Sequence, residues 1–446
     1  MTPSDREKRL LDVGRRVVET SGADETEVLL SEGREFLTRF SRNRLHQNVG
    51  TEEVWAIVRL VAGKRVGVAT TSSLAAEALE TAVASALAIA EASEPDKTWP
   101  GLPKPRPVKA VEAYDAETAQ ASADARADFA AEIIAAARKK RAEAAGIVET
   151  AESSLAIVSS AGVAVASSRT RAEANTVVTC GDGSGYAEGL GTCLSALRGH
   201  RIGQRAALTA SISRKPRPLD AGRYDVVLEP AAVGEWLQYL AYVALSGKDF
   251  EEGSSPLSGR LGEKVTGEQV TIWDNALDRR TIPQAFDYEG MPKKRLSLID
   301  RGVAKGVGTN HYRARHLGKR ISTGSALPAS SSAECLPLHL FMKGGTSSAR
   351  RLVAEMKRGL VITRFHYTNI LDPMKTVLTG MTRDGTFLVE DGRIVHPVRN
   401  LRYTENVLEA LGRIDGMTQK LTLVAGPCVV PTVRIKGVQF TGTTEF

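Results

Sequence analysis

Residues 224–263 read YDVVLEPAAVGEWLQYLAYVALSGKDFEEGSSPLSGRLGE, and this stretch decides how the second half of the chain is organised. Its start, Tyr224–Leu228, is rich in β-branched side chains and predicts a strand. Pro230 stands where a helix can begin, and apolar residues then recur at helical spacing over 231–245. Ser246-Gly247 is expected to end the helix. The stretch therefore predicts a strand, a buried helix and a glycine-rich loop in succession.

The predicted helix is informative for the residue types that it lacks. It contains no histidine, and Glu235 is its only acidic residue. A helix of the zinc-peptidase kind carries two histidines on one face as metal ligands and a glutamate as general base. Neither HExxH nor HExxxH occurs anywhere in the 446 residues. We therefore expect this chain to carry no catalytic residue of that kind, no metal and no cofactor.

The composition is that of a globular protein with ordinary cores. Hydrophobic residues make up 42% and charged residues 25% of the chain, so two or three domains can each bury a core. The net charge of +7 comes from 59 basic and 52 acidic residues that are well mixed along the chain. A nucleic-acid-binding protein would concentrate its basic residues in a patch or stripe. The charge pattern therefore argues against nucleic acid as a partner.

The apolar runs, the N-terminal residues and the cysteine spacing bear on where the protein is located. No apolar run approaches the ~18 residues of a membrane helix, and the first residues are charged and unlike a signal peptide. The four cysteines are scattered and form no CxxC pair. We therefore expect a cytoplasmic protein with reduced thiols and no membrane contact.

The order of elements predicts an α+β protein, with an N-terminal α/β domain and a C-terminal, largely antiparallel β domain. The N-terminal half alternates helix patterns with strand patterns, and the C-terminal half is mostly strand and turn. The expected parts are an N-terminal α+β region over 1–93, a proline-rich linker over 94–108, a middle α+β region over 109–215 that completes the N-terminal domain, and a β-rich domain over 216–446.

Several finer expectations concern the N-terminal half. Apolar stripes predict helices over 4–22 and 73–92, and an alanine-rich helix over 116–145. Gly183 and Gly185 place a loop at 182–185. Separate short strands are predicted at 27–31, 35–40, 53–61, 64–69, 146–153, 155–160, 163–170 and 172–180.

A basic segment at 310–320 holds the first candidate site residues. His311 and His316 stand five residues apart among arginines, whose charge disfavours binding of a metal cation. We expect a loop or strand in which His311, Arg313 and His316 line a cavity and can hold acidic groups of a peptide. Metal binding by the two histidines is the alternative.

Two further sets of candidates come from the C-terminal half. Arg364, His366 and Thr368 alternate along a predicted strand, so they share one face that can contact a substrate backbone or a partner; an ordinary sheet surface is the alternative. Ser254 and Ser255 lie in the glycine-rich loop. Because no GxSxG nucleophile elbow is present, a loop or subunit contact is favoured over a serine nucleophile.

Seven segments of the chain resemble the TldD/PmbA family (TldD/TldE peptidases, also called modulators of DNA gyrase). The block TGMTRDGTFLVEDGRIVHPVRNLRYTE at 379–405 and the strand GLVITRFHYTNILDP at 359–373 carry most of the resemblance. It extends over nearly the whole chain through GRYDVVLEPAAVGEW at 222–236, GSSPLSGRLGEKV at 253–265, VVPTVRIKGVQFTG at 429–442, EVLLSEGREFLTRFSRNRL at 27–45 and KRVGVATTSSL at 64–74.

The resemblance implies two kinds of subunit. The TldD kind carries HExxxH on the helix after the GRYDVVLEP-like strand, with a C-terminal cysteine completing a zinc site; the TldE (PmbA) kind lacks the motif and pairs with it. Here Gln238, Tyr239 and Val243 stand where the motif residues would be. Cys428 falls near the place of the cysteine, and we interpret it as a small core residue. The resemblance thus implies a TldE-like subunit of a cytoplasmic heterodimer that cleaves unfolded or leader peptides, with zinc in the TldD-like partner and an extended peptide as substrate.

Two other classes of function stay open. A stand-alone, metal-independent enzyme of a biosynthetic pathway would need a cluster of titratable groups with perturbed pKa values facing a cavity. A non-catalytic binding protein, of nucleic acid for example, would need a continuous basic stripe.

Overall fold

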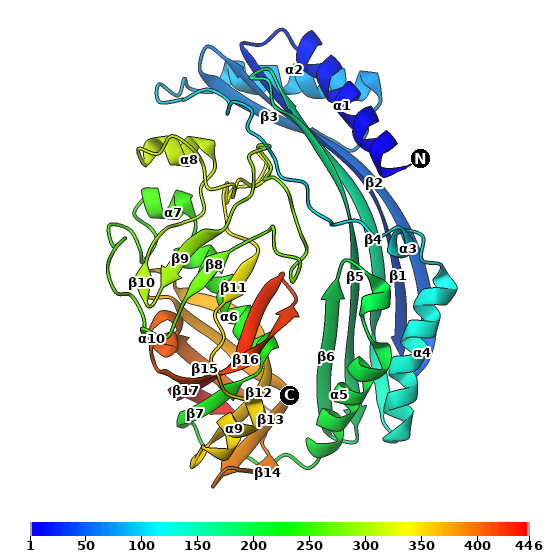
Figure 1. The fold of residues 1–446 in the computed structure, drawn as a ribbon, viewed down its shortest axis with the longest axis vertical. Coiled ribbons are helices and arrows are strands. Elements are labelled where there is room, and N and C mark those ends of the chain that lie inside the picture. The colour runs from blue at the N-terminus through cyan, green and yellow to red at the C-terminus, as the bar shows by residue number, and fades with distance from the viewer. Residues whose placement is uncertain (1, 444–446) are drawn as a thin grey trace.

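The computed structural model describes residues 2–443, and these form two halves that are each built on one β-sheet. Figure 1 shows the N-terminal sheet arching along one side of the molecule, with the C-terminal half lying against its concave face. The α+β class expected from the sequence is confirmed. Among the described residues, no helix has both the length and the apolar character needed to cross a membrane.

The N-terminal sheet has six strands in the order β3-β2-β1-β4-β5-β6, each antiparallel to its neighbours. The strands are β1 (Glu25–Ser41), β2 (Arg44–Ala62), β3 (Arg65–Thr71), β4 (Glu143–Ser159), β5 (Ala164–Cys180) and β6 (Gly183–Gly191).

The strands predicted at 53–61 and 64–69 are confirmed as parts of β2 and β3. The separate short strands predicted elsewhere in this half are wrong, because β1 replaces those at 27–31 and 35–40, β4 replaces those at 146–153 and 155–160, and β5 replaces those at 163–170 and 172–180. Residues such as Glu32-Gly33-Arg34, which interrupt the apolar pattern, continue the backbone ladder on both sides of β1. The loop predicted at 182–185 is also wrong. Gly183 and Gly185 belong to β6, and a β-carbon on Gly185 would lie 2.2 Å from the Ala206 carbonyl oxygen of the helix that covers this strand. Glycine is needed here because a helix backbone approaches the strand closely.

Helices cover the convex face of the N-terminal sheet. They are α1 (Pro3–Thr20), α2 (Ala76–Ala92), α4 (Ala123–Lys139) and α5 (Gly199–Ile212). The prediction that 116–145 is mainly helical is confirmed, but the helix is interrupted and ends before 145. The chain forms a short α3 (Ala116–Ala119), restarts where the Ser122 hydroxyl accepts a hydrogen bond from the Ala125 N–H, and turns at Arg141 (φ 53°) into β4.

The C-terminal half holds an eleven-stranded sheet. Within the described residues its pairings are antiparallel except β7–β12 and β11–β17, in agreement with the expectation. The strands are β7 (Gly222–Leu228), β8 (Ile272–Asp274), β9 (Leu296–Asp300), β10 (Val303–Ala304), β11 (Leu340–Met342), β12 (Arg358–Asp372), β13 (Val377–Glu390), β14 (Arg393–Pro397), β15 (Leu401–Asn406), β16 (Ile414–Val424) and β17 (Cys428–Thr443).

The predicted strand and helix at the centre of this half are both present, as β7 and α6 (Pro230–Ala244). Trp236 of α6 is fully buried, stacked on Phe365 of β12 with ring centroids 5.3 Å apart, and Tyr403 of β15 lies beside both rings. Burying three aromatic rings stabilises this core by several kcal/mol. It also fixes which face of α6 remains available at the surface. Four short α-helices complete the half: α7 (Gly247–Glu251), α8 (His311–His316), α9 (Ala349–Ala354) and α10 (Val407–Gly412), the last directly before β16.

The two halves meet at an apolar and an ionic contact. Leu29, Ile57 and Ile157 of the N-terminal sheet pack against Phe286 and Met291. Beside them, buried Arg59 of β2 lies 2.8 Å from the Glu27 carboxylate and 3.3 Å from that of Glu289. Such a contact holds the concave face of the sheet at a fixed distance from the C-terminal half, and the space left between them forms cavities.

Candidate functional site

A cavity of about 510 Å³ lies where α6 comes closest to the N-terminal sheet, and we call it the α6 cavity. Its walls come from the solvent face of α6, the edge strand β6, the part of β12 that extends beyond its pairing with β7, and the end of β16 with the loop after it. Its polar lining consists of Tyr186, Glu188, Glu235, Gln238, Tyr239, Arg364, His366, Thr368 and Asn369.

The side chains of α6 in this cavity are arranged by helical spacing. Glu235, Gln238 and Tyr239 lie three and four residues apart along one side of the helix, which the core leaves only partly buried. The Gln238 amide donates a hydrogen bond to the Ala425 carbonyl at 2.7 Å, and the Tyr239 hydroxyl donates one to the Thr368 carbonyl. These two side chains therefore fix the loop after β16 and the irregular part of β12 around the cavity.

Two carboxyl groups face the cavity, and burial raises the pKa of both. The Glu188 carboxylate accepts hydrogen bonds from the Tyr186 hydroxyl at 2.7 Å and the Ala425 N–H at 3.3 Å, which oppose the effect of burial. Burial also raises the pKa of Glu235, and the negative charge of Glu188 adds to it. A raised pKa means that burial favours the protonated form of each carboxyl more than water would. Glu188 and Glu235 are therefore the candidates for proton transfer in this cavity.

Arg364 supplies the positive charge of the cavity. Its Nε donates to the Asp384 carboxylate at 2.7 Å, and its guanidinium lies 4.1 Å from the Tyr186 ring centroid. Burial lowers the pKa of the nearby His366, and the charges of Arg383 and Arg364 lower it further. Both sequence-predicted residues thus line the cavity, with His366 as a neutral ring.

Thr368 does not share a face with Arg364 and His366, so that prediction is wrong. The register of β12 against β13 shifts after His366, and Tyr367 has a φ of 53°. This irregularity turns the Thr368 hydroxyl inward, where it hydrogen-bonds the Tyr403 hydroxyl at 2.9 Å. Alternation along a strand cannot foresee a bulge that breaks it.

Ser254 and Ser255 lie outside the α6 cavity and make local backbone hydrogen bonds. The Ser255 hydroxyl is buried, donates to the Ala244 carbonyl at 2.9 Å and accepts from the Leu257 N–H at 3.1 Å. The Ser254 hydroxyl donates to the Asp249 carbonyl at 3.3 Å. These bonds hold the loop against the end of α6, as expected of a structural loop.

The basic segment forms the helix α8, and the loop or strand predicted there is wrong. Arg313 binds three carboxylates, those of Glu251, Glu252 and Glu334, at 2.8–3.0 Å. The sequence could not foresee that glutamates distant in the chain would occupy this guanidinium.

The two histidines of α8 are likewise engaged within the C-terminal half. The His316 Nδ1 lies 2.7 Å from the Glu251 carboxylate, and the backbone N–H of His311 donates to Glu289 at 2.7 Å. Neither ring lines the α6 cavity. A role for this segment in holding a peptide therefore has no support in its position.

Tyr186 and Glu188 of β6 were missed from the sequence. They alternate along YAEGLG, a glycine-rich run with few β-branched residues, and so give only a weak strand signal. Their importance comes from the packing of β6 beside β13 and β16 of the other half. No local pattern encodes that contact.

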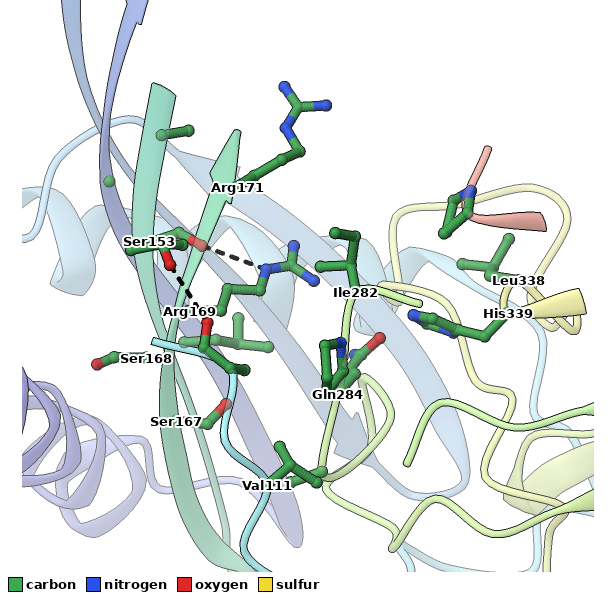
Figure 2. A pocket seen from close by; sticks show the side chains of 18 of the residues that line it. Val111, Ser153, Ser167, Ser168, Arg169, Arg171, Ile282, Gln284, Leu338 and His339 are labelled. Atoms are coloured by element: carbon green, nitrogen blue, oxygen red, sulfur yellow. Dashed lines mark hydrogen bonds between the residues drawn. The ribbon is translucent and has the colours of Figure 1, made fainter. Parts of the chain in front are cut away.

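A second, larger cavity of about 1020 Å³ lies between the concave face of the N-terminal sheet and the C-terminal half (Figure 2). We call it the interdomain cavity. Ser153, Ser168 and Arg169 line it from β4 and β5, and Gln284 and His339 line it from the opposite side. Gln238 of α6 lines both cavities, so they are neighbours.

Three family models match consecutive parts of the chain. The PmbA/TldA metallopeptidase domain 1 matches residues 26–90, the central domain matches 116–214, and the C-terminal domain matches 221–442. The chain belongs to the PmbA/TldD family. The family expected from the sequence is therefore confirmed.

Curated relatives include a metalloprotease of Methanothermobacter thermautotrophicus, 27% identical over 286 residues that make up 62% of each chain. A Haemophilus influenzae protein named metalloprotease TldD homolog is 27% identical over 46% of this chain and 43% of its own length. The matches thus span between about two fifths and three fifths of these relatives. Among solved structures, TldE from Thermococcus kodakarensis superimposes with a TM-score of 0.86 at 22% identity, covering 98% of this chain and 99% of that one. That likeness supports the PmbA/TldD fold.

The family models describe a metallopeptidase, so the chain's residues can be tested against a zinc site. At the positions where the resemblance places the metal motif, the Gln238 amide and Tyr239 phenol are engaged in hydrogen bonds, and the Val243 side chain is buried in the core. Cys428 is fully buried, its thiol bonds to the Gly426 carbonyl at 3.2 Å, and burial raises the pKa of that thiol. An amide, a phenol, an alkyl group and a protonated thiol do not fit zinc. In addition, no group of three or more His, Cys, Asp or Glu side chains suited to a metal occurs within residues 2–443.

Proposed function

We propose that this chain is the non-metal-binding, TldE-like subunit of a cytoplasmic TldD/TldE-type peptidase that cleaves unfolded or leader peptides, and that a TldD-like HExxxH subunit supplies the zinc. The observation that carries the proposal is the solvent face of α6. It bounds a cavity, as a catalytic helix would, yet Gln238 and Tyr239 on this face, and Val243 in the core, stand where the resemblance places the ligands and the base. Because the chain has the cavity but no residues for metal chemistry, it is suited to be a subunit that positions the substrate for a second, catalytic subunit.

The strand edges around the α6 cavity suit an extended peptide. β6 is the last strand of its sheet, and β12 continues past the end of β7. Main-chain groups on such edges can pair with an added strand whatever its sequence, which fits a substrate class defined by being unfolded. Here Arg364 and His366 of β12 remain candidate substrate contacts.

The exposed half of β2 suits the partner subunit. Residues 44–54 are exposed along their whole length, and β3 pairs only with the other half of the strand. Leu45, Val49 and Val54 expose apolar surface there. A long strand edge with exposed apolar side chains is a surface on which another chain can pair.

Co-expression tests the proposal. The chain would be produced alone and together with an HExxxH-bearing relative from the same genome. The proposal predicts a 1:1 complex by mass, and cleavage of an unfolded peptide only by that complex. Cleavage by the HExxxH subunit alone at the same rate, with no complex formed, would contradict it.

A second candidate, a metal-independent hydrolase, is favoured by the two carboxyls of the α6 cavity. Glu188 and Glu235 line one cavity and both have raised pKa values, and Arg364 can orient an anionic group between them. One protonated and one ionised carboxyl are the requirements for general acid–base catalysis. This candidate predicts cleavage by the chain alone, insensitive to chelators and lost in Glu235→Gln.

A further inference from the structure

Polar side chains from both halves face one another across the interdomain cavity. Figure 2 shows Arg169 extending from β5 toward Ile282, Gln284 and His339 on the opposite wall. Buried polar groups in folded proteins are nearly always paired, yet the buried His339 Nδ1 has no hydrogen-bond partner within the described residues. An unpaired ring nitrogen that faces a guanidinium across a cavity indicates a polar ligand.

Arg169 is the cation among these side chains, and unlike the nearby Arg171 it has no carboxylate partner among the described residues. Arg171, two residues along β5, contacts the carboxylates of Glu35, Glu149 and Glu173. The Arg169 guanidinium has only its Nε bonded, to the Ser153 hydroxyl at 3.3 Å, and no carboxylate of residues 2–443 lies within 4.0 Å of it. Its two terminal nitrogens are free to bind an anion in the bidentate manner.

His339 supplies an acceptor. The side chain is 4% exposed, and its Nδ1 has no partner in the described part of the chain. In the neutral tautomer that carries its proton on Nε2, which the nearby Ile282 backbone favours, Nδ1 has a lone pair. Burial and the charges of Lys293 and Arg169 lower the pKa of His339, so the ring stays neutral. Nδ1 can therefore accept a hydrogen bond from an N–H group.

The surroundings select the kind of anion. Gln284, also buried, adds an amide that donates and accepts, and Ile282, Leu338 and Val111 make the neighbouring walls apolar. The other charged residues that line the cavity are Glu7, Glu35, Glu53, Glu152, Glu173, Arg34, Lys109 and Arg171. With Arg169 included, five carboxylates face four cations, so a monoanion meets less repulsion here than a phosphate dianion.

We propose that Arg169, Gln284 and His339 form a subsite for a carboxylate of a bound peptide, with Arg169 binding the carboxylate and His339 accepting from a peptide N–H. The carboxylate comes from the peptide's C-terminus or from an acidic side chain. This inference deepens the proposed function, since it takes peptides to be what enters the chamber between the halves.

Fluorescence anisotropy on the full chain tests the subsite with three labelled peptides of one unstructured sequence. The first ends in a free carboxylate after leucine, the second is its C-terminal amide, and the third is the amide with one internal glutamate. We expect the amide to bind about tenfold more weakly than at least one of the carboxylate peptides, as for a lost charge-assisted hydrogen bond. Preference for the first peptide assigns the C-terminus; preference for the third assigns a side chain.

Substitutions make the test specific. Arg169→Gln should bring the three affinities together, and Arg169→Lys should restore part of the preference. Lys109→Gln is the matched control, because it removes the same charge from an exposed position lining the same cavity. Equal affinities for all three peptides in the unaltered chain, or equal effects of Arg169→Gln and Lys109→Gln, would overturn the proposal. The assay needs no partner, so failure of the heterodimer and failure of the subsite are separate results.

Discussion

Glu152 of β4 makes ionic contacts whose contribution to the free energy of unfolding can be worked out from its pKa. Its carboxylate is 2% exposed and accepts from Arg6 of α1, from Arg34 of β1 at 2.7 Å, and from the Tyr114 hydroxyl at 2.9 Å. Burial alone would raise the pKa of Glu152, but the hydrogen bonds from Arg6, Arg34 and Tyr114 outweigh it and lower the pKa to about 2. The contact joins α1, the N-terminal sheet and the segment over 94–115 that connects α2 to α3, and it lies at the wall of the interdomain cavity.

The magnitude follows from the difference between the folded pKa of about 2 and the ordinary value of 4.5. This difference corresponds to about 3 kcal/mol of the free energy of unfolding. Because the folded pKa is lowered, the stabilisation is full above pH 4.5 and is lost as the pH falls toward 2. At pH 3 about 1 kcal/mol should remain by the same linkage relation.

Urea unfolding of Glu152→Gln and the unaltered chain, at pH 7 and pH 3, measures this prediction. At pH 7 the variant should unfold at a lower urea concentration than the unaltered chain. At pH 3 the difference in free energy of unfolding between the two proteins should be less than half of its value at pH 7. Glu355→Gln is the matched control, since Glu355 makes the same kind of ion pair at the surface, where such pairs contribute little. Two results would refute the reasoning. One is a urea midpoint for Glu152→Gln that differs from that of the unaltered chain by no more than the Glu355→Gln midpoint does. The other is a difference between the Glu152→Gln and unaltered midpoints that does not change with pH.

Three other predictions concern buried groups. The Arg59 guanidinium faces two buried carboxylates, and burial raises the pKa of Glu27 to about 7. Between pH 4.5 and 7 the folded chain therefore holds a proton that the unfolded chain has lost, so raising the pH through this window should lower the free energy of unfolding by up to about 3 kcal/mol. In urea titrations, Glu27→Gln should make the free energy of unfolding less dependent on pH over the same window. Among the four thiols, half-buried Cys193 should react with a thiol reagent in the native protein, whereas Cys428 should react only after denaturation, as mass spectrometry of labelled peptides would show. Gly67→Ala should destabilise by about 1–3 kcal/mol in thermal unfolding, because its β-carbon would lie 1.9 Å from a carbonyl oxygen of α2.

The fold was predictable where local pattern and tertiary contact agree. The β7 and α6 pair follows from periodicity, since Trp236 and its neighbours lie on the face that the core buries. The long strands of the N-terminal sheet were not predictable in full. Gly33 and Arg34 look like turn residues, but the ladders on both sides of β1 carry the chain through them.

The candidate site was predictable only in part, for a physical reason. Arg364 and His366 were found because they lie on a strand with a strong local signal. Glu188, Arg169 and His339 matter because of what the two halves bring to face them across a cavity. The β12 bulge at Tyr367 and the glutamates around Arg313 depend on contacts between segments far apart in sequence.

The most direct test of the account is the metal content of this chain measured alone and in complex. Both samples would be purified from the same zinc-supplemented culture, with the HExxxH subunit as partner, and analysed by inductively coupled plasma mass spectrometry and by peptide cleavage. The account predicts no stoichiometric zinc and no cleavage for the chain alone, and one zinc per 1:1 complex with cleavage that a chelator abolishes. Stoichiometric zinc in the isolated chain, with chelator-sensitive cleavage, would contradict the claim that another subunit supplies the metal.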